Sequence, residues 1–171
     1  MELTSRLLAL WYDDAPLRPP AFAEAIREAW ADEPFLSGGR RGSYLTESFK
    51  RGGYDVHSML EELLVEWGRE LMNPREKRTL AAMRFPKTVF RGGIGEAIDV
   101  ADGMSWTLDL KIAKFYATVW PERSGDQRPP IVVSAVVHRW DVVAFLNDRR
   151  ESELLIPCPY DSCEEFQLVE I

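Results

Sequence analysis

Histidine and cysteine are scarce in this chain, with two of each among 171 residues. His57 and His138 do not lie at metal-ligand spacing from each other or from the cysteines. Zinc chemistry and cysteine–histidine catalysis are therefore disfavoured, and we expect no bound metal. Cys158 and Cys163 could close a small disulfide loop, but two free thiols are favoured in a cytosolic protein.

Long apolar runs are also lacking, because no stretch approaches the ~20 residues that span a bilayer. The N-terminal sequence MELTSRLLALWYDD has an acidic second residue. It lacks the basic start and the small-residue cleavage site of a signal peptide. We therefore expect a cytoplasmic protein that does not act at a membrane, unless it is delivered by a route that the sequence does not reveal.

Positive charge is in deficit, with 21 Lys and Arg against 28 Asp and Glu, giving a net charge of −7. Broad binding to nucleic acid depends on neutralising phosphates, so this balance argues against it. The net charge does not exclude a small basic pocket that binds one anionic ligand. The basic, glycine-rich segment 37–53 is interpreted as a solvated loop, with contact to an anionic target or to the adenosine side of a nucleotide as the alternative.

What is present is an ordinary globular composition, 46% hydrophobic and 29% charged, in a chain long enough for one domain. Hydrophobic periodicity predicts helices at 3–12, 21–31, 56–71, 75–83 and 110–120. It predicts strands at 88–91, 104–107, 131–137 and 166–171, a strand within 150–157 that carries Glu151 and Glu153, and a turn or short helix at 141–145. We expect a single α+β domain over 1–171, with a helical layer (1–86) packed on a β-rich core (87–171).

Two glutamates, Glu151 and Glu153, precede the apolar run Leu154–Ile156. Side chains at positions i and i+2 of a strand share a face, so we expect both carboxylates to point the same way. Like charges so placed repel each other. Either both lie in water at a frayed strand end, or a cationic substrate and transition state relieve the repulsion.

Two earlier segments give this pair a context. A strand ends in Phe90-Arg91-Gly92, and a second strand, Ser105-Trp106-Thr107, leads into a helix with aromatic residues. In this order the three segments resemble the signature of the ADP-ribosyltransferase family in its Arg–Ser–Glu branch, which is related to bacterial toxins that modify arginine. The resemblance covers residues 88–171. Trp106 stands where Thr is common, and we expect it to point away from Ser105 and Thr107.

The resemblance implies a β core of the ADP-ribosyltransferase type and NAD⁺ as substrate. Arg91 would offer donors to the pyrophosphate, and the backbone of Gly92 would approach the nicotinamide carboxamide. Glu153 would stabilise the positive charge that develops on the ribose as nicotinamide leaves. Ser105 would orient Glu153 through a hydrogen bond, and Glu151 would hold or deprotonate the acceptor.

Further residues complete the implied NAD⁺ site. Thr107 shares a strand face with Ser105 and is assigned to it. An aromatic side chain is expected to stack on the nicotinamide, and the candidates are Tyr116, Phe115, Trp120 and Trp140. A place in the core would explain Tyr116 equally well, because its helical spacing matches neighbouring apolar residues.

The acceptor is expected to meet the segment Asp148-Arg149-Arg150, which stands where this family reads its target. A solvated turn explains these residues equally well. The function implied is mono-ADP-ribosyl transfer to a macromolecule, with a protein arginine favoured over nucleic acid. Stand-alone enzymes of this type often act as toxins or phage effectors. The alternatives are an NAD⁺ glycohydrolase and a non-catalytic binding module on the same fold.

Overall fold

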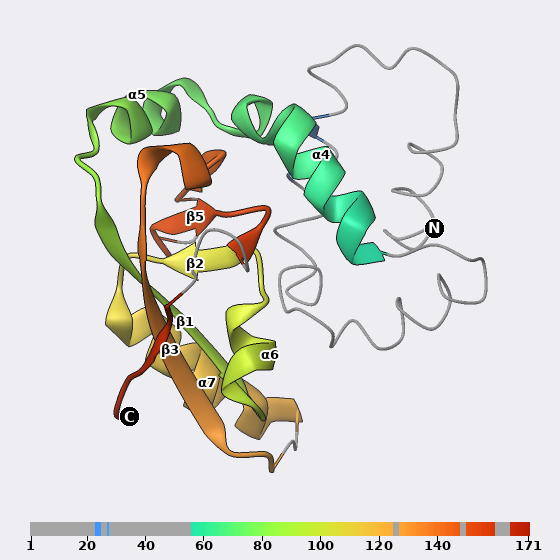
Figure 1. The fold of residues 1–171 in the computed structure, drawn as a ribbon, viewed down its shortest axis with the longest axis vertical. Helices are drawn as coiled ribbons and strands as arrows, with labels where there is room; N and C mark the ends of the chain where they lie inside the picture. Colours follow the sequence, from blue (N-terminus) through green and yellow to red (C-terminus); the bar gives the residue numbers. More distant parts are fainter. Residues whose placement is uncertain (1–22, 25–26, 28–55, 125–126, 148–149, 160–164) are drawn as a thin grey trace.

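The structure, a computed structural model, describes residues 23–24, 27, 56–124, 127–147, 150–159 and 165–171 (Figure 1). The predicted helix 3–12 and the loop 37–53 lie outside these residues. Of the predicted helix 21–31, residues Ala23, Glu24 and Arg27 are described, and all three are helical. In the described part of the chain, no helix is long and apolar enough to cross a membrane.

Two helices open the well-described part of the chain. Helix α4 (Val56–Leu71) has the predicted bounds, and α5 (Pro74–Ala82) follows after a short break. The break is set by Asn73, whose side chain accepts hydrogen bonds from the backbone of Arg75 and Glu76. Glu76 accepts in return from the Asn73 backbone N–H at 2.9 Å. This reciprocal cap ends one helix and starts the next.

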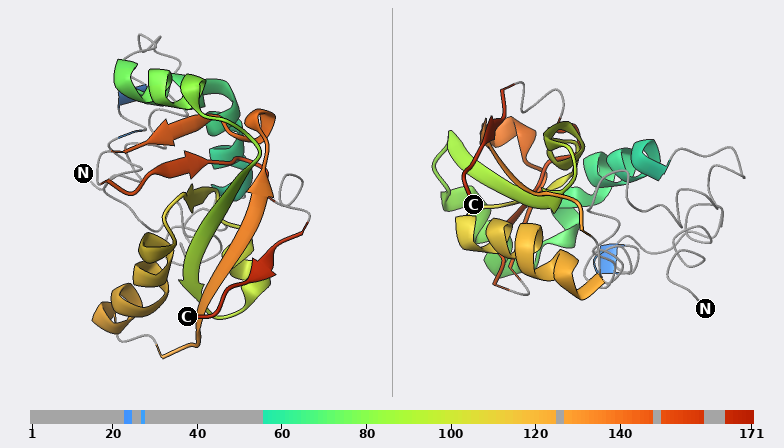
Figure 2. Two further views of the ribbon diagram at one scale, coloured as in Figure 1. Left: turned by 90° about the vertical axis from the view of Figure 1, so that its left-hand side faces the viewer. Right: turned by 90° about the horizontal axis from the view of Figure 1, so that it is seen from below.

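A six-stranded antiparallel sheet follows, in the order β4-β5-β2-β1-β3-β6. The strands are β1 (Lys87–Ile94), β2 (Ser105–Thr107), β3 (Pro130–Val137), β4 (Ala144–Leu146), β5 (Glu153–Leu155) and β6 (Gln167–Leu168). Strands β1 and β3 pair along their whole length, and the short strands β2 and β5 run crosswise to this pair (Figures 1 and 2). The fold is therefore α+β, as predicted.

Two helices flank the long strand pair. Helix α7 (Leu110–Ser124) contacts β1 and β3, and the short helix α6 (Ala97–Ala101) contacts the same two strands. A Cβ added at Gly92 would meet α7 at Ala113, whereas one added at Gly93 would meet Val100 of α6. Because successive residues of a strand face opposite sides, α7 covers one face of β1 and α6 covers the other.

The helices α4 and α5 lie at the other end of the sheet, where both contact β4. Leu64 of α4 and Leu80 of α5 belong to the same buried cluster as Trp106 of β2 and Leu154 of β5. One hydrophobic core therefore joins α4 and α5 to the sheet. The Cys158 thiol donates to Glu61 Oε1 at 2.7 Å, and Cys163 lies outside the described residues.

Two local predictions are wrong. The segment 141–145 was expected to form a turn or short helix, but a 3₁₀ helix, η2, lies earlier at Arg139–Asp141, and Ala144–Leu146 forms strand β4. All three residues of β4 are buried, so they show no alternation that would mark a strand. Helix α6 was not predicted, since five residues are too few to reveal a helical period.

Candidate active site

Ser105 and Glu153 are brought together by the pairing of β2 with β5. Thr107 lies opposite Glu153, and Ser105 lies opposite Leu155, so Ser105 and Glu153 are diagonal neighbours on one face. The Ser105 hydroxyl donates a hydrogen bond to Glu153 Oε1, which is the contact that the sequence predicts. Trp106 points to the other face, as expected: it is 1% exposed, and its Nε1 donates to the Gly103 carbonyl at 2.7 Å.

Arg91, from β1, lies next to Ser105 and donates hydrogen bonds to the protein's own backbone. Its Nε donates to the Val100 carbonyl at 2.9 Å, and its Nη1 donates to the carbonyl of Ser105. Burial lowers the pKa of Arg91 to about 10, while the charges of Glu153 and Asp102 act to raise it. The side chain therefore carries a positive charge at neutral pH. It holds the end of α6 and the start of β2 together, a task that its position before two glycines does not reveal.

Gly92 and Gly93 also have a structural task. A Cβ at Gly92 would lie 1.7 Å from the Ala113 carbonyl oxygen, and one at Gly93 would lie 2.9 Å from Val100 Cγ2. The sequence predicts that these glycines let the backbone approach a ligand. In the structure, the close approach is made by α7 at Gly92 and by α6 at Gly93. Helix packing is therefore a sufficient reason for both glycines.

Glu151 does not share a strand with Glu153, so this expectation is corrected. Strand β5 begins at Glu153, and Ser152 has a left-handed φ of 47°, which interrupts the extended backbone before it. Glu151 is held from two sides instead. The Thr107 hydroxyl donates to the Glu151 carbonyl at 2.5 Å, and the Tyr116 hydroxyl donates to Glu151 Oε1 at 2.7 Å.

Thr107 and Tyr116 thus act on the turn that carries Glu151. Thr107 is buried and also accepts from the Asp109 backbone N–H at 3.0 Å, just before α7. Tyr116 is half-buried, and its ring lies edge-on to Phe115 with centroids 5.5 Å apart. The hydrogen bond from its hydroxyl to Glu151 gives Tyr116 a polar role beside the carboxylate. This role differs from both expectations for Tyr116, which were a place in the core and stacking on nicotinamide.

The other aromatic candidates lie at the surface or beside Tyr116. The ring centroid of Trp120 is 6.1 Å from that of Tyr116, and the residue is 37% exposed. Trp140 is 79% exposed and stacks on His138 with centroids 4.6 Å apart. Trp140 therefore lies on η2, away from the strands that carry Ser105 and Glu153.

The segment before Glu151 is anchored by Asn147 and by Glu76, of which sequence reasoning missed Glu76. Asp148 and Arg149 lie outside the described residues, and Arg150 is exposed with a left-handed φ of 61°. Asn147 accepts a hydrogen bond from the Ser152 backbone N–H at 3.1 Å, which closes the base of the turn. The Asn147 backbone N–H donates to Glu76 Oε1 at 2.9 Å.

Glu76 is 3% exposed, although it comes from the charged sequence Pro74-Arg75-Glu76-Lys77-Arg78. Arg27 pairs with it through Nη1 at 2.8 Å and Nη2 at 3.0 Å. Burial acts to raise the pKa of Glu76, but these hydrogen bonds, those from Asn73 and Asn147, and the charge of Arg27 hold it below its ordinary value. The capping pattern of Asn73 and Glu76 was the one sequence signal that could have singled this residue out.

The site therefore contains two carboxylates with different supports, since Glu153 is held by Ser105 and Glu151 is held by Tyr116. The Arg91 cation donates to the Ser105 carbonyl and interacts with the charge of Glu153. The sequence matches no protein-family model, and comparison with curated proteins and with solved structures finds no match.

Proposed function

We propose that this protein is a mono-ADP-ribosyltransferase that moves ADP-ribose from NAD⁺ to a macromolecular acceptor and releases nicotinamide. The observation that carries the proposal is the hydrogen bond from Ser105 to Glu153 on paired strands, with Arg91 bound to the carbonyl of Ser105. These residues are the three that the family resemblance assigns to the reaction. Their convergence supports a common task for segments that are far apart in the sequence.

In this proposal Glu153 acts on the sugar. Breaking the bond between nicotinamide and ribose builds positive charge on the ribose, and a carboxylate held against it lowers the barrier. Ser105 keeps the carboxylate in one orientation, so it need not reorganise during the reaction. Arg91 contributes by holding the backbone of Ser105, and its charge interacts favourably with Glu153.

Glu151 acts on the acceptor. It stands outside β5 in a turn, where its carboxylate is aimed by Tyr116 independently of Glu153. A separately supported carboxylate can hold a cationic acceptor or accept its proton. A protein arginine side chain fits this role, because a guanidinium forms charge-assisted hydrogen bonds with carboxylates.

The test compares Glu151→Gln and Glu153→Gln in two assays: transfer of label from NAD⁺ to lysate proteins, and hydrolysis of NAD⁺ without acceptor. Glu153→Gln should abolish both activities. Glu151→Gln should reduce transfer by about 100-fold or more, the range for a positioned acid or base, and retain hydrolysis. Glu66→Gln, an exposed glutamate on α4, is the matched control and should change neither.

The outcomes separate the alternatives. If the wild-type protein hydrolyses NAD⁺ without transferring label, and Glu151→Gln changes the result of neither assay, the protein is an NAD⁺ glycohydrolase. If the folded wild-type protein neither consumes nor binds NAD⁺, the proposed function is wrong and a binding module on this fold remains. Equal loss of both activities in the two variants would refute the division of labour between the glutamates.

A further inference from the structure

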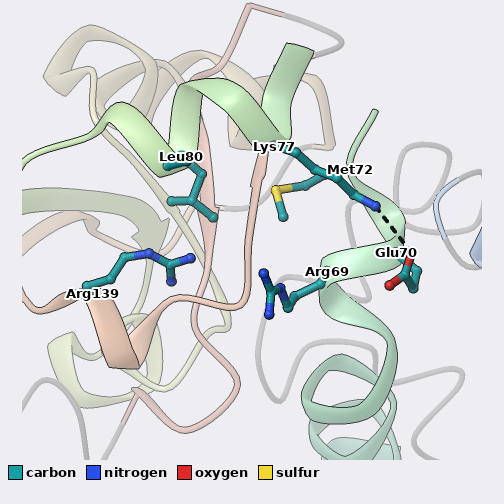
Figure 3. A pocket seen from close by; sticks show the side chains of 7 residues that line it. Arg69, Glu70, Met72, Lys77, Leu80 and Arg139 are labelled. Atoms are coloured by element: carbon teal, nitrogen blue, oxygen red, sulfur yellow. Dashed lines mark hydrogen bonds and ion pairs between the residues drawn. The ribbon is translucent and has the colours of Figure 1, made fainter. Parts of the chain in front are cut away.

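A polar cavity outside the candidate active site lies between the end of α4, helix α5 and η2 (Figure 3). Its volume is about 230 Å³, and none of the residues assigned above to NAD⁺ or to catalysis lines it. Arg69, Lys77 and Arg139 supply positive charge, and Glu70 supplies one carboxylate. Met72 and Leu80, both buried, form its apolar floor.

The charges in this cavity oppose the sign of the whole chain. Three cations and one carboxylate give a local charge of 3 − 1 = +2 in a chain of net charge −7. Glu70 pairs with Lys77 at 3.2 Å, and both side chains are about half exposed, at 55% and 46%. Such an exposed pair contributes little, so an incoming anion can compete with Glu70 for the ammonium group.

The two arginines are arranged differently. Arg69 and Arg139 extend toward the same space from opposite sides of the cavity (Figure 3). Arg139 is oriented by the hydrogen bond from its Nη1 to the Val142 carbonyl at 2.9 Å. Two guanidinium groups facing one another repel, and an anion between them turns this repulsion into attraction. Each also presents the planar set of donors that suits phosphate oxygens.

We propose that this cavity binds a phosphate-type dianion, either inorganic phosphate or the phosphate group of a small phosphomonoester. Its volume is below the ~300 Å³ at which sites for drug-sized ligands begin, so it suits one phosphoryl group rather than a dinucleotide. The overall acidic charge of the chain disfavours a polyanion, whereas a single local dianion needs only the three lining cations. This site is independent of the proposed reaction.

The test is a titration of the full-length ¹⁵N-labelled protein, followed by backbone amide shifts at constant ionic strength. Sodium phosphate and phenyl phosphate are the two probes, with sodium chloride as the control for screening. Both probes should give saturable shifts at Arg69, Lys77 and Arg139. Tighter binding of phenyl phosphate would identify a phosphomonoester that uses the apolar floor, and equal binding would identify the free anion.

Variants make the assignment specific. Arg139→Ala and Arg69→Ala should each weaken phosphate binding about tenfold, the lower range for a charged hydrogen bond. Glu70→Gln should strengthen it severalfold, since it removes the competing carboxylate. Arg78→Ala is the matched control, because it removes an exposed cation from α5 that does not line the cavity, and should leave affinity unchanged.

Arg69→Ala provides a second test if Arg139→Ala fails to fold, because Arg69 is exposed at the end of α4. The proposal is overturned if phosphate gives no saturable shifts, if the shifts map to other residues, or if Arg78→Ala weakens binding as much as Arg139→Ala. Because NAD⁺ is absent from every arm, the outcome does not depend on the enzymatic proposal.

Discussion

Replacing Glu76 by Gln should lower the free energy of unfolding by more than its place in a charged helix suggests. Each carboxylate oxygen accepts two hydrogen bonds. Oε2 accepts from Arg27 Nη1 at 2.8 Å and from the Asn73 N–H at 2.9 Å. Oε1 accepts from Arg27 Nη2 at 3.0 Å and from the Asn147 N–H at 2.9 Å. A Gln amide has one oxygen, so either orientation places its NH₂ group against two donors.

The magnitude follows from burial. The side chain of Glu76 is 4% exposed and that of Arg27 is 19% exposed, so the substitution removes the Glu76 carboxylate from a largely buried guanidinium. Breaking a buried ion pair by removing one partner costs about 3–5 kcal/mol. Because Arg27 retains some contact with solvent, we expect the lower end of that range, a loss of about 3 kcal/mol in the free energy of unfolding.

Urea denaturation at pH 7, followed by tryptophan fluorescence, measures this loss. Glu70→Gln is the matched control: it also replaces one glutamate in an ion pair with a lysine or arginine, but that pair is exposed. Glu70→Gln should change stability by less than about 0.5 kcal/mol. A loss below about 1 kcal/mol in Glu76→Gln would refute the view that this carboxylate anchors the Arg27 helix and the Asn147 turn.

Three further predictions follow from the same geometry. Burial acts to raise the pKa of Glu76, but its hydrogen bonds and the charge of Arg27 hold this pKa below 4.5 in the folded protein. The stability that results is complete above about pH 5 and is lost as pH falls through the folded pKa. The unfolding curves of wild type and Glu76→Gln should therefore converge in acid. Gly92→Ala should lower the free energy of unfolding by about 1–3 kcal/mol or more in urea, because its Cβ would meet the Ala113 carbonyl at 1.7 Å; an unchanged midpoint would contradict the close approach of α7. Leu64→Ala should cost about 2–5 kcal/mol and keep one cooperative transition, since Leu64 is 1% exposed in the common core; two separate transitions would indicate independent domains.

The long elements were predictable because their apolar residues recur over enough turns or pleats. Helix α4 has the expected bounds, and β3, which is apolar except for Ser134, is within one residue of its prediction. The bounds of β1 were underestimated, because Gly92 and Gly93 suggested a loop although both continue the pairing with β3. Glycine is a poor strand former in isolation, but here the approach of two helices requires it.

The sequence places Ser105 and Glu153 on two strands, and the pairing of these strands brings the two side chains into contact. The hydrogen bond itself was implied by the resemblance to the ADP-ribosyltransferase family and not by local patterns. The left-handed φ of Ser152 cannot be inferred from composition, since non-glycine residues rarely adopt it, and it removes Glu151 from the strand. Glu76 was missed because its partner Arg27 lies 49 residues away, and the surrounding charges suggested a solvated helix.

The turn between β4 and β5 is tied down at both ends by different parts of the molecule. Asn147 is held by Glu76 and by its own contact with Ser152, while Glu151 is held by Thr107 and Tyr116. Arg150, which lies between these two anchored residues, is exposed and can therefore change in charge or size without moving either end. The exposed part of this turn can therefore vary while the Glu151 carboxylate keeps its position. A change in binding specificity can arise in the turn with little loss of stability.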